Sequence, residues 1–499
     1  MKRSITYFKR VLQVSAMLFL LPLSCDDFLD KPLQGKLTQE NFPTSASDAL
    51  LATNGVYNIM LNSSFHFGLF PIMDIMSDDA RKGSNPDDQG STIGPFDRFA
   101  HIATESDLSR WWNTLYEGVR RANVVIEKVP DIEMDETLSN RYIGEASFLR
   151  ALFYFDLVRA WGDVPIMIST IPVLGVERSS ADQVYDLIEQ DLLVAISGLP
   201  EKSDYAAADL GRATKGAAKS LLAKVYLFQN DFVNAEKYAL EVINSGQYDL
   251  MPDFTDANSK AGEFGAESIF EIGAIGFEGT GGDQYGNVQG VRGTPNRGWG
   301  FNRPSLDLMD AFEPNDPRED KTIIFLGEVL DGVTIQGDGP TLDETKDANG
   351  NLIEIECYNQ KVWTPGVNVP SQFDHNRRII RYADVLLMAA EALNENSKSA
   401  DALIQLNKVR ERARHGNNAI LPDITETAKD PLRDIILHER RVELALEGHR
   451  FWDLVRTGKA ASVLGPLGFV QGKHEMLPIP QAEMDLTQNV WDQNPGWSN

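Results

Sequence analysis

Residues 141–161, RYIGEASFLRALFYFDLVRAW, decide the fold class of this chain. Apolar side chains would occupy nearly every face of the helix that this stretch predicts, so the helix must be buried among other helices. Ser180 and Gln183 have the spacing of a capping box at the start of an amphipathic helix. Asp430 followed by Pro431 predicts another helix start, with an N-cap and then proline at the first helical position. We therefore predict a mainly α-helical protein.

Two segments, 216–245 and 383–413, repeat each other. The same offsets carry small and apolar residues in both segments: Ala223, Tyr226, Ala235, Ala239 and Val242 in the first, and Ala390, Leu393, Ala402, Leu406 and Val409 in the second. Small residues at these offsets let two antiparallel helices pack closely, as in tetratricopeptide repeats. Two unrelated helical hairpins that share alanine are the alternative. The pattern favours a tetratricopeptide-like repeat scaffold.

The composition changes between the two repeats. Residues 262–300 contain 12 of the 39 glycines, and proline, asparagine and aspartate remain frequent up to residue 376. Short strand-like runs occur at 267–272, 321–326 and 351–356. This pattern predicts an inserted, irregular, loop-rich lobe that contains short strands. Long loops on a rigid scaffold often carry binding sites.

The N-terminus has the pattern of an export signal. Basic residues precede an apolar run over 11–23, which is too short for a comfortable bilayer span. The run ends in Leu-Pro-Leu-Ser-Cys at 21–25, which resembles a bacterial lipobox, although Pro22 departs from the usual aliphatic residue. We predict that Cys25 is lipidated; plain secretion is the alternative. The expected organisation is a signal peptide (1–24), a lipidated tether (25–43), an N-terminal helical part (44–250), the irregular lobe (251–380) and a C-terminal part (381–499), in one compact fold overall.

Charge and cysteine content exclude several classes of function. The chain has 47 basic and 73 acidic residues, a net charge of −26, which argues against nucleic acid as a main ligand. Cys25 and Cys357 are the two cysteines, and two thiolates cannot form a zinc cluster. No H-E-x-x-H, G-x-S-x-G, Walker or G-x-G-x-x-G motif occurs, and the seven histidines lack metal-ligand spacing. We expect no catalytic residues, no metal and no cofactor. A helical glycoside hydrolase remains an alternative, because its two carboxylates need not be close in sequence.

Charged and aromatic residues give the remaining candidates. Residues 438–458 alternate in charge at helical spacings, which we interpret as a structural ion-pair network. An aromatic ring on a polar loop can stack on a sugar, with nearby polar groups bonding its hydroxyls. The candidate ligand-binding residues are Trp299, Tyr285, Phe301, Phe96, Asp79 and Arg81. Each ring could instead anchor its loop to the core. Trp299 is the best candidate, because the sequence Arg-Gly-Trp-Gly gives it no local apolar neighbours.

Four long motifs, in order, resemble the SusD/RagB family of outer-membrane lipoproteins of Bacteroidetes. Residues 25–33 are similar to the lipidated start of that family. The four motifs are RYIGEASFLRALFYFDLVRAWGDVPI (141–166), RYADVLLMAAEALNE (381–395), ERRVELALEGHRFWDLVRTGK (439–459) and LPIPQAEMDLTQNVWDQNPGW (477–497). The resemblance extends from Cys25 to the end of the chain.

The resemblance implies a cell-surface lipoprotein, anchored to the outer membrane by lipid, that is not an enzyme. It implies that the chain binds a nutrient, most often an oligo- or polysaccharide, and delivers it to a SusC-like TonB-dependent transporter. Its motifs are scaffold, so the ligand residues are expected in the variable loops. Two alternatives stay open: a peptide-binding member of the same family, and a repeat scaffold that binds only protein partners.

Overall fold

The computed structural model describes residues 42–67, 72–171, 173, 175–276, 284–366, 369, 372–487 and 490–498. The predicted signal peptide and the predicted lipidation at Cys25 lie outside these residues. Ser45–Asn499 form one compact unit.

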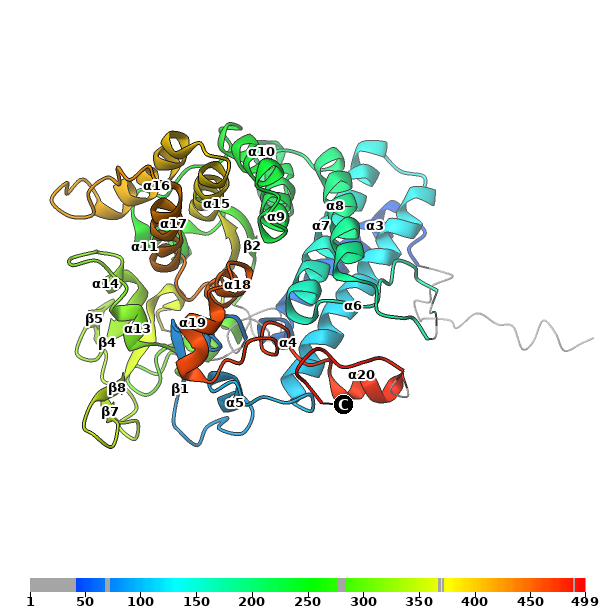
Figure 1. The fold of residues 1–499 in the computed structure, drawn as a ribbon. Coiled ribbons are helices and arrows are strands. Elements are labelled where there is room, and N and C mark those ends of the chain that lie inside the picture. Colours follow the sequence, from blue (N-terminus) through cyan, green and yellow to red (C-terminus); the bar gives the residue numbers. More distant parts are fainter. Residues whose placement is uncertain are drawn as a thin grey trace, which may run out of the picture. The chain divides into compact units, whose positions relative to one another are not determined.

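The first half of the unit is a layer of packed helices (Figure 1). Its members are α3 (Ala46–Tyr57), α4 (Ser63–Phe67), α6 (Ser106–Lys128), α7 (Glu136–Trp161) and α8 (Ala181–Gly198). The short helix α5 (Gly94–Asp97) lies apart from this layer, next to residues 80–83. From Tyr142 to Trp161 nearly every side chain of α7 is buried, as its sequence predicts. Ser180 and Gln183 form the predicted capping box at the start of α8.

The two predicted repeats are helical hairpins that lie next to each other. They consist of α9 (Lys215–Phe228) with α10 (Phe232–Ile243), and α15 (Tyr382–Glu395) with α16 (Ser399–Arg414). Helix α10 packs against α15, and α15 also packs against α17 (Lys429–Glu443). The helices α7 to α10 and α15 to α17 thus form a continuous stack, which confirms the mainly α, tetratricopeptide-like scaffold (Figure 1).

One predicted helix start is wrong by two residues. The N-cap of α17 is Ala428 rather than Asp430, and Pro431 is therefore the third helical residue. Proline is tolerated there because the N–H groups of the first turn have no partner within the helix.

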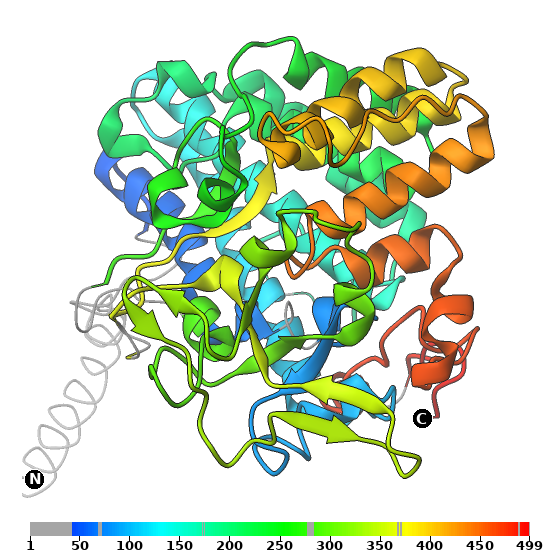
Figure 2. The same ribbon diagram turned by 90° about the vertical axis from the view of Figure 1, so that its left-hand side faces the viewer.

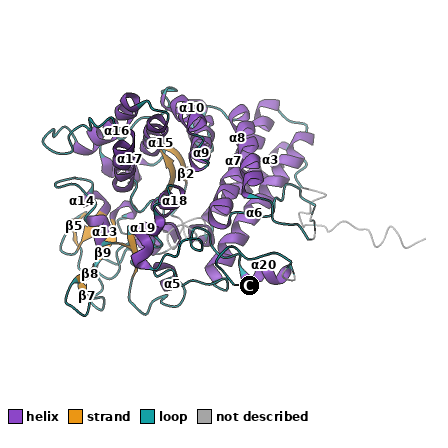
Figure 3. Ribbon diagram, viewed as in Figure 1, coloured by secondary structure: helices purple, strands orange, loops and turns teal. Residues whose placement is uncertain are grey.

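The irregular lobe contains short antiparallel strand pairs (Figures 2 and 3). The pairs are β1 (Ala80–Gly83) with β3 (Phe301–Pro304), β2 (Ser268–Ile272) with β10 (Arg377–Arg381), β4 (Ile323–Phe325) with β9 (Cys357–Asn359), β5 (Val329–Leu330) with β6 (Val333–Thr334), and β7 (Glu344–Lys346) with β8 (Leu352–Ile355). Strands β2, β4 and β8 lie within the three strand-like runs of the sequence. Strand β1 comes from the N-terminal part of the chain, so that part also contributes to the lobe.

Short helices complete the unit. They are α11 (Phe254–Asn258), α12 (Gln284–Gln289), α13 (Leu306–Met309), α14 (Glu319–Thr322), α18 (Arg450–Arg456), α19 (Ala460–Leu464) and α20 (Gln481–Leu486). None of the described helices is long and apolar enough to cross a bilayer.

Buried ion pairs connect the lobe to the scaffold. Glu443 accepts hydrogen bonds from Arg318, Arg381 and Arg412. Glu447 is 2.6 Å from Nζ of Lys361 and also binds Arg381. All of these side chains are almost completely buried. The charged segment 438–458 is therefore structural, as its pattern indicates, because it holds the C-terminal helices against β10 and the lobe.

Candidate functional site

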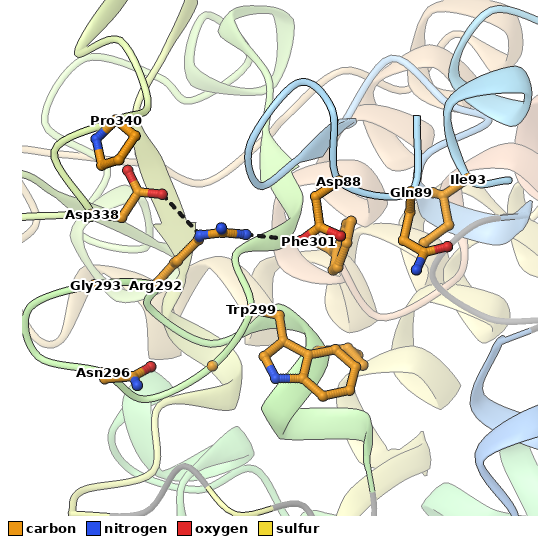
Figure 4. Close-up of a pocket in the computed structure, with 12 residues that line it drawn as sticks. Asp88, Gln89, Ile93, Arg292, Gly293, Asn296, Trp299, Phe301, Asp338 and Pro340 are labelled. Carbon is orange, nitrogen blue, oxygen red and sulfur yellow. Dashed lines mark hydrogen bonds and ion pairs between the residues drawn. The ribbon is translucent and has the colours of Figure 1, made fainter. Parts of the chain in front are cut away.

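A cavity of about 730 Å³ opens in the lobe, close to Trp299 (Figure 4). Three segments surround it: the loop that follows β1, the loop 290–300 between α12 and β3, and the turn at 337–340. The side chains that line it include polar and charged groups together with Trp299, and the polar ones are Asp88, Gln89, Arg292, Asn296 and Asp338.

The backbone of the loop 290–300 is fixed by its own hydrogen bonds and by its neighbours. The amide of Arg297 donates to the carbonyl of Val291, and the amide of Gly300 donates to that of Gly290. On the far side, Thr294 and residues 336–337 exchange two backbone hydrogen bonds. Gly293 has a φ of +84°, and a Cβ atom there would lie 2.1 Å from the carbonyl oxygen of Gly337. Glycine is thus required for the close approach of the two walls of the pocket.

The floor of the pocket is apolar. Phe301 and Val288 pack with Ile75 and Ile93 in one buried cluster, and three of these four side chains line the cavity. Burying one such side chain stabilises the folded protein by about 1.5–3 kcal/mol relative to leaving it exposed. This cluster therefore holds the loops above it in place.

Trp299 remains partly open above this floor. Its side chain is 36% exposed, and its amide donates to the carbonyl of Asn287. Within the described part of the chain, its indole forms no hydrogen bond and no ring stack. A large ring that is held by its backbone and is partly open to a cavity can stack on a flat apolar ligand surface and donate one hydrogen bond through its N–H.

Arg292 joins two walls of the pocket. Its Nη1 atom lies 2.8 Å from Oδ2 of Asp88 and also binds the hydroxyl of Ser84. Its Nε atom lies 2.8 Å from Oδ2 of Asp338 on the opposite side (Figure 4). Tyr358 donates to the carbonyl oxygen of Arg292. The guanidinium is therefore bracketed by two carboxylates, while Gln89 and Asn296 extend exposed amide groups at the rim.

Two of the six candidate residues meet at this pocket, Trp299 and Phe301. Phe301 is 3% exposed and contributes to the floor. Tyr285 is buried beside His66 and Arg377 and does not line the pocket.

The other three candidates have structural contacts elsewhere. Phe96 is fully buried and stacks on His101. Asp79 is fully buried and accepts a hydrogen bond from Arg441. Arg81 pairs with Asp307. Phe96 and Asp79 are buried and cannot contact a ligand, although the role predicted for them requires an exposed side chain. Arg81 does not line the pocket.

Sequence reasoning did not single out Arg292, Asp88, Gln89, Asn296 or Asp338. These residues are separated by up to 250 positions, and no spacing rule joins them. A weak signal was available, since each lies within two residues of a glycine or proline in a turn-rich stretch, where binding residues concentrate.

The described residues contain no group of three or more His, Cys, Asp or Glu side chains arranged to hold a metal ion. A second open cavity, of about 600 Å³, lies over α9 and α10. Lys219, Lys237, Glu201 and Glu241 are among its lining residues, and no aromatic ring is. That surface lacks a stacking face, so the Trp299 pocket is the better candidate.

Comparisons with known proteins give a consistent result. A family model described as the SusD family matches residues 266–468, and one described as "Starch-binding associating with outer membrane" matches residues 73–227. The SusD-like protein P2 of Formosa agariphila is 32% identical to this chain, over 96% of the chain and 98% of the relative. Among solved structures, a laminarin-binding SusD-like protein matches with a TM-score of 0.76 and 31% identity, covering 91% of this chain and all of the other. Surface glycan-binding protein A of Bacteroides thetaiotaomicron, solved with laminarihexaose, matches with a TM-score of 0.75 and 28% identity, covering 90% of this chain and all of the other.

Proposed function

This chain belongs to the SusD family, and we propose on that premise that it binds a glycan in the Trp299 pocket at the cell surface. The observation that carries the proposal is the Trp299 side chain, 36% exposed and without an intramolecular partner among the described residues, beside polar groups from three loops. Sugar rings have apolar faces that stack on aromatic rings and hydroxyls that bond to amide and charged groups.

The pocket suits a glycan better than an extended peptide. A peptide that adds to a sheet edge needs unpaired backbone groups along that edge. In the loop 290–300 the backbone groups of Arg297 and Gly300 are bonded within the loop, and Thr294 pairs with Gly337. Side-chain amides and the indole N–H are the available donors, which favours hydroxyl groups as ligands.

We place the protein on the outer membrane, held by lipid on Cys25, where it passes its ligand to a SusC-like TonB-dependent transporter without cleaving it. Family membership and the near-lipobox at 21–25 support this role. Pull-down of a tagged, lipidated chain from detergent-solubilised outer membranes should recover the transporter, whereas a Cys25→Ala chain should be recovered in the soluble fraction.

Glycan binding is tested with the chain from residue 26 to residue 499 on a panel of polysaccharides. Laminarin comes first, since two related structures are described with laminarin or laminarihexaose. Affinity electrophoresis is run beside a reducing-end assay on the same samples. Retardation without new reducing ends supports the proposal. New reducing ends would contradict it in favour of a hydrolase, and retardation by none of the panel would contradict glycan binding.

A further inference from the structure

The described charged side chains that line the Trp299 pocket are one cation between two carboxylates. Among the described lining residues Arg292 is the one cation, and Asp88 and Asp338 are the two carboxylates. Both carboxylates lie 2.8 Å from nitrogen atoms of Arg292. The trio carries a net charge of −1, although a guanidinium lies at its centre.

Two of the three guanidinium nitrogens of Arg292 already contact protein groups. Nη1 binds Asp88 and Ser84, and Nε faces Asp338. A carboxylate or sulfate on a ligand would normally bind a guanidinium through two parallel hydrogen bonds. Here the protein supplies the anions itself, so an incoming anion would meet two carboxylates next to the cation it needs.

Charged groups near the pocket do not offset the net negative charge of Arg292, Asp88 and Asp338. Lys82 donates its ammonium hydrogens to the carbonyls of Gly83, Asn85 and Asp88 and does not line the cavity. Arg297 lies on the same loop as Arg292 and also does not line the cavity. Glu356 adds a carboxyl group next to Asp338, from which it accepts a backbone hydrogen bond.

We infer that this pocket selects uncharged glycans over sulfated or uronic ones, and that Asp88 and Asp338 set the selection by neutralising Arg292. This inference rests on the proposed glycan-binding function. The mechanism is local: at physiological salt, charges farther away than about 8 Å are largely screened, so the overall charge of −26 contributes little. The pocket discriminates because a sulfated or uronic glycan would place its negative charge next to the carboxylates of Asp88 and Asp338.

The test compares matched ligands and matched variants. Titration calorimetry in 150 mM NaCl measures the dissociation constants of laminarin, laminarin sulfate, dextran and dextran sulfate. The proteins are the native chain, the double variant Asp88→Asn/Asp338→Asn and a control, Asp423→Asn/Asp430→Asn. The control removes two carboxylates from exposed ion pairs with Arg414 and Arg433, outside the pocket lining, so it matches the change in net charge. Asparagine keeps an acceptor oxygen for Arg292, and urea unfolding confirms that each variant folds.

We expect the native chain and the control to bind laminarin sulfate at least about tenfold more weakly than laminarin. The pocket variant should bind at least one of the two sulfated glycans about tenfold or more tightly than the native chain does. Tighter binding of a sulfated glycan than of its neutral counterpart by the native chain would overturn the inference and leave glycan binding intact. An equal gain in the control would also overturn it. If the native chain binds none of the four glycans but the pocket variant alone gains affinity for a sulfated one, the charge inference stands, and the neutral ligand of the pocket is a glycan other than laminarin or dextran.

Discussion

Asp88 and Arg292 are 204 residues apart in sequence, yet Oδ2 of Asp88 lies 2.8 Å from Nη1 of Arg292. The contact joins the loop after β1 to the loop between α12 and β3. With Asp338 on the other side of Arg292, it fixes three loops around one cavity beside Trp299 (Figure 4). The site is thus assembled from three irregular loops on a helical scaffold.

Gly293→Ala should damage the pocket more than Gly339→Ala does. Both glycines have a positive φ, +84° and +76°, so each alanine brings a similar backbone strain of about 1 kcal/mol. A Cβ atom at residue 293 would also overlap the carbonyl oxygen of Gly337, whereas nothing lies within 4 Å of one at residue 339. We expect Gly293→Ala to weaken glycan binding at least about tenfold more than Gly339→Ala. Equal affinities of the two variants would show that the contact between residues 293 and 337 does not shape the site.

Glu443→Gln should be strongly destabilising. The carboxylate of Glu443 binds Arg318, Arg381 and Arg412 where water is excluded, so removing its charge leaves buried cations short of a partner. Breaking such a buried pair costs about 3–5 kcal/mol of unfolding free energy. Asp430→Asn, which breaks the exposed pair with Arg433, should cost less than about 1 kcal/mol. Urea unfolding measures both, and similar losses would contradict the structural role of the buried network.

Acid should unfold the protein through the same network. Burial works to raise the pKa of Glu447, but Arg381 and Lys361 outweigh it and lower the pKa from 4.5 to about 2. A carboxyl pKa that is lower in the folded state gives stability that is present above pH 4.5 and is lost as the pH falls towards 2. The loss from this group is about 3 kcal/mol. Unfolding free energies from urea titrations between pH 6 and pH 2.5 check this, and Glu447→Gln should flatten that dependence. If the unfolding free energy of the native protein does not fall between pH 6 and pH 2.5, the lowered pKa of Glu447 is refuted.

The raised pKa of Asp74 should make the folded state less stable as the pH rises, opposite to the effect of Glu447. Burial raises the pKa of this fully buried carboxyl group to about 7, although Asn302 and the amide of Gly448 donate hydrogen bonds to it. A raised carboxyl pKa gives stability that is complete below pH 3.8 and is lost as the pH rises through 7, by on the order of 4 kcal/mol at most. Asp74→Asn should therefore narrow the difference in stability between pH 5 and pH 8. An unchanged difference in the variant would mean that Asp74 is already ionised at pH 5.

Sequence patterns predicted the scaffold well, because its determinants are local. Each of these patterns lies within one helix or one helical hairpin: the all-round apolar pattern of α7, the small-residue offsets of α9–α10 and of α15–α16, and the capping box at Ser180. Trp299 was also predicted as the leading ligand candidate from its glycine neighbours, and the structure places it at the pocket.

The polar part of the site depends on contacts that no local pattern encodes. Asp79 and Asp88 are both acidic residues in one turn-rich stretch, yet Asp79 turns inward to Arg441 and Asp88 turns to Arg292. The partner of Asp79 lies on α17 and the partner of Asp88 lies on the loop 290–300, and both are more than 200 residues away in sequence. Phe96 and Tyr285 were candidates for the same reason as Trp299, and tertiary packing against His101 and His66 buries them.

We propose that Trp299 is the platform on which a glycan binds, and a comparison of two tryptophan variants tests this proposal. Calorimetric titration of a glycan that retards the native chain is repeated with Trp299→Ala and with Trp491→Ala, whose indole bonds to the carbonyl of Val176 outside the pocket lining. We expect Trp299→Ala to lose at least about tenfold in affinity, because the stacking ring is removed, and to keep the urea midpoint of the native chain. Trp491→Ala should keep the native affinity. Native affinity in a folded Trp299→Ala variant would rule out Trp299 as the platform and put the binding site elsewhere on the molecule.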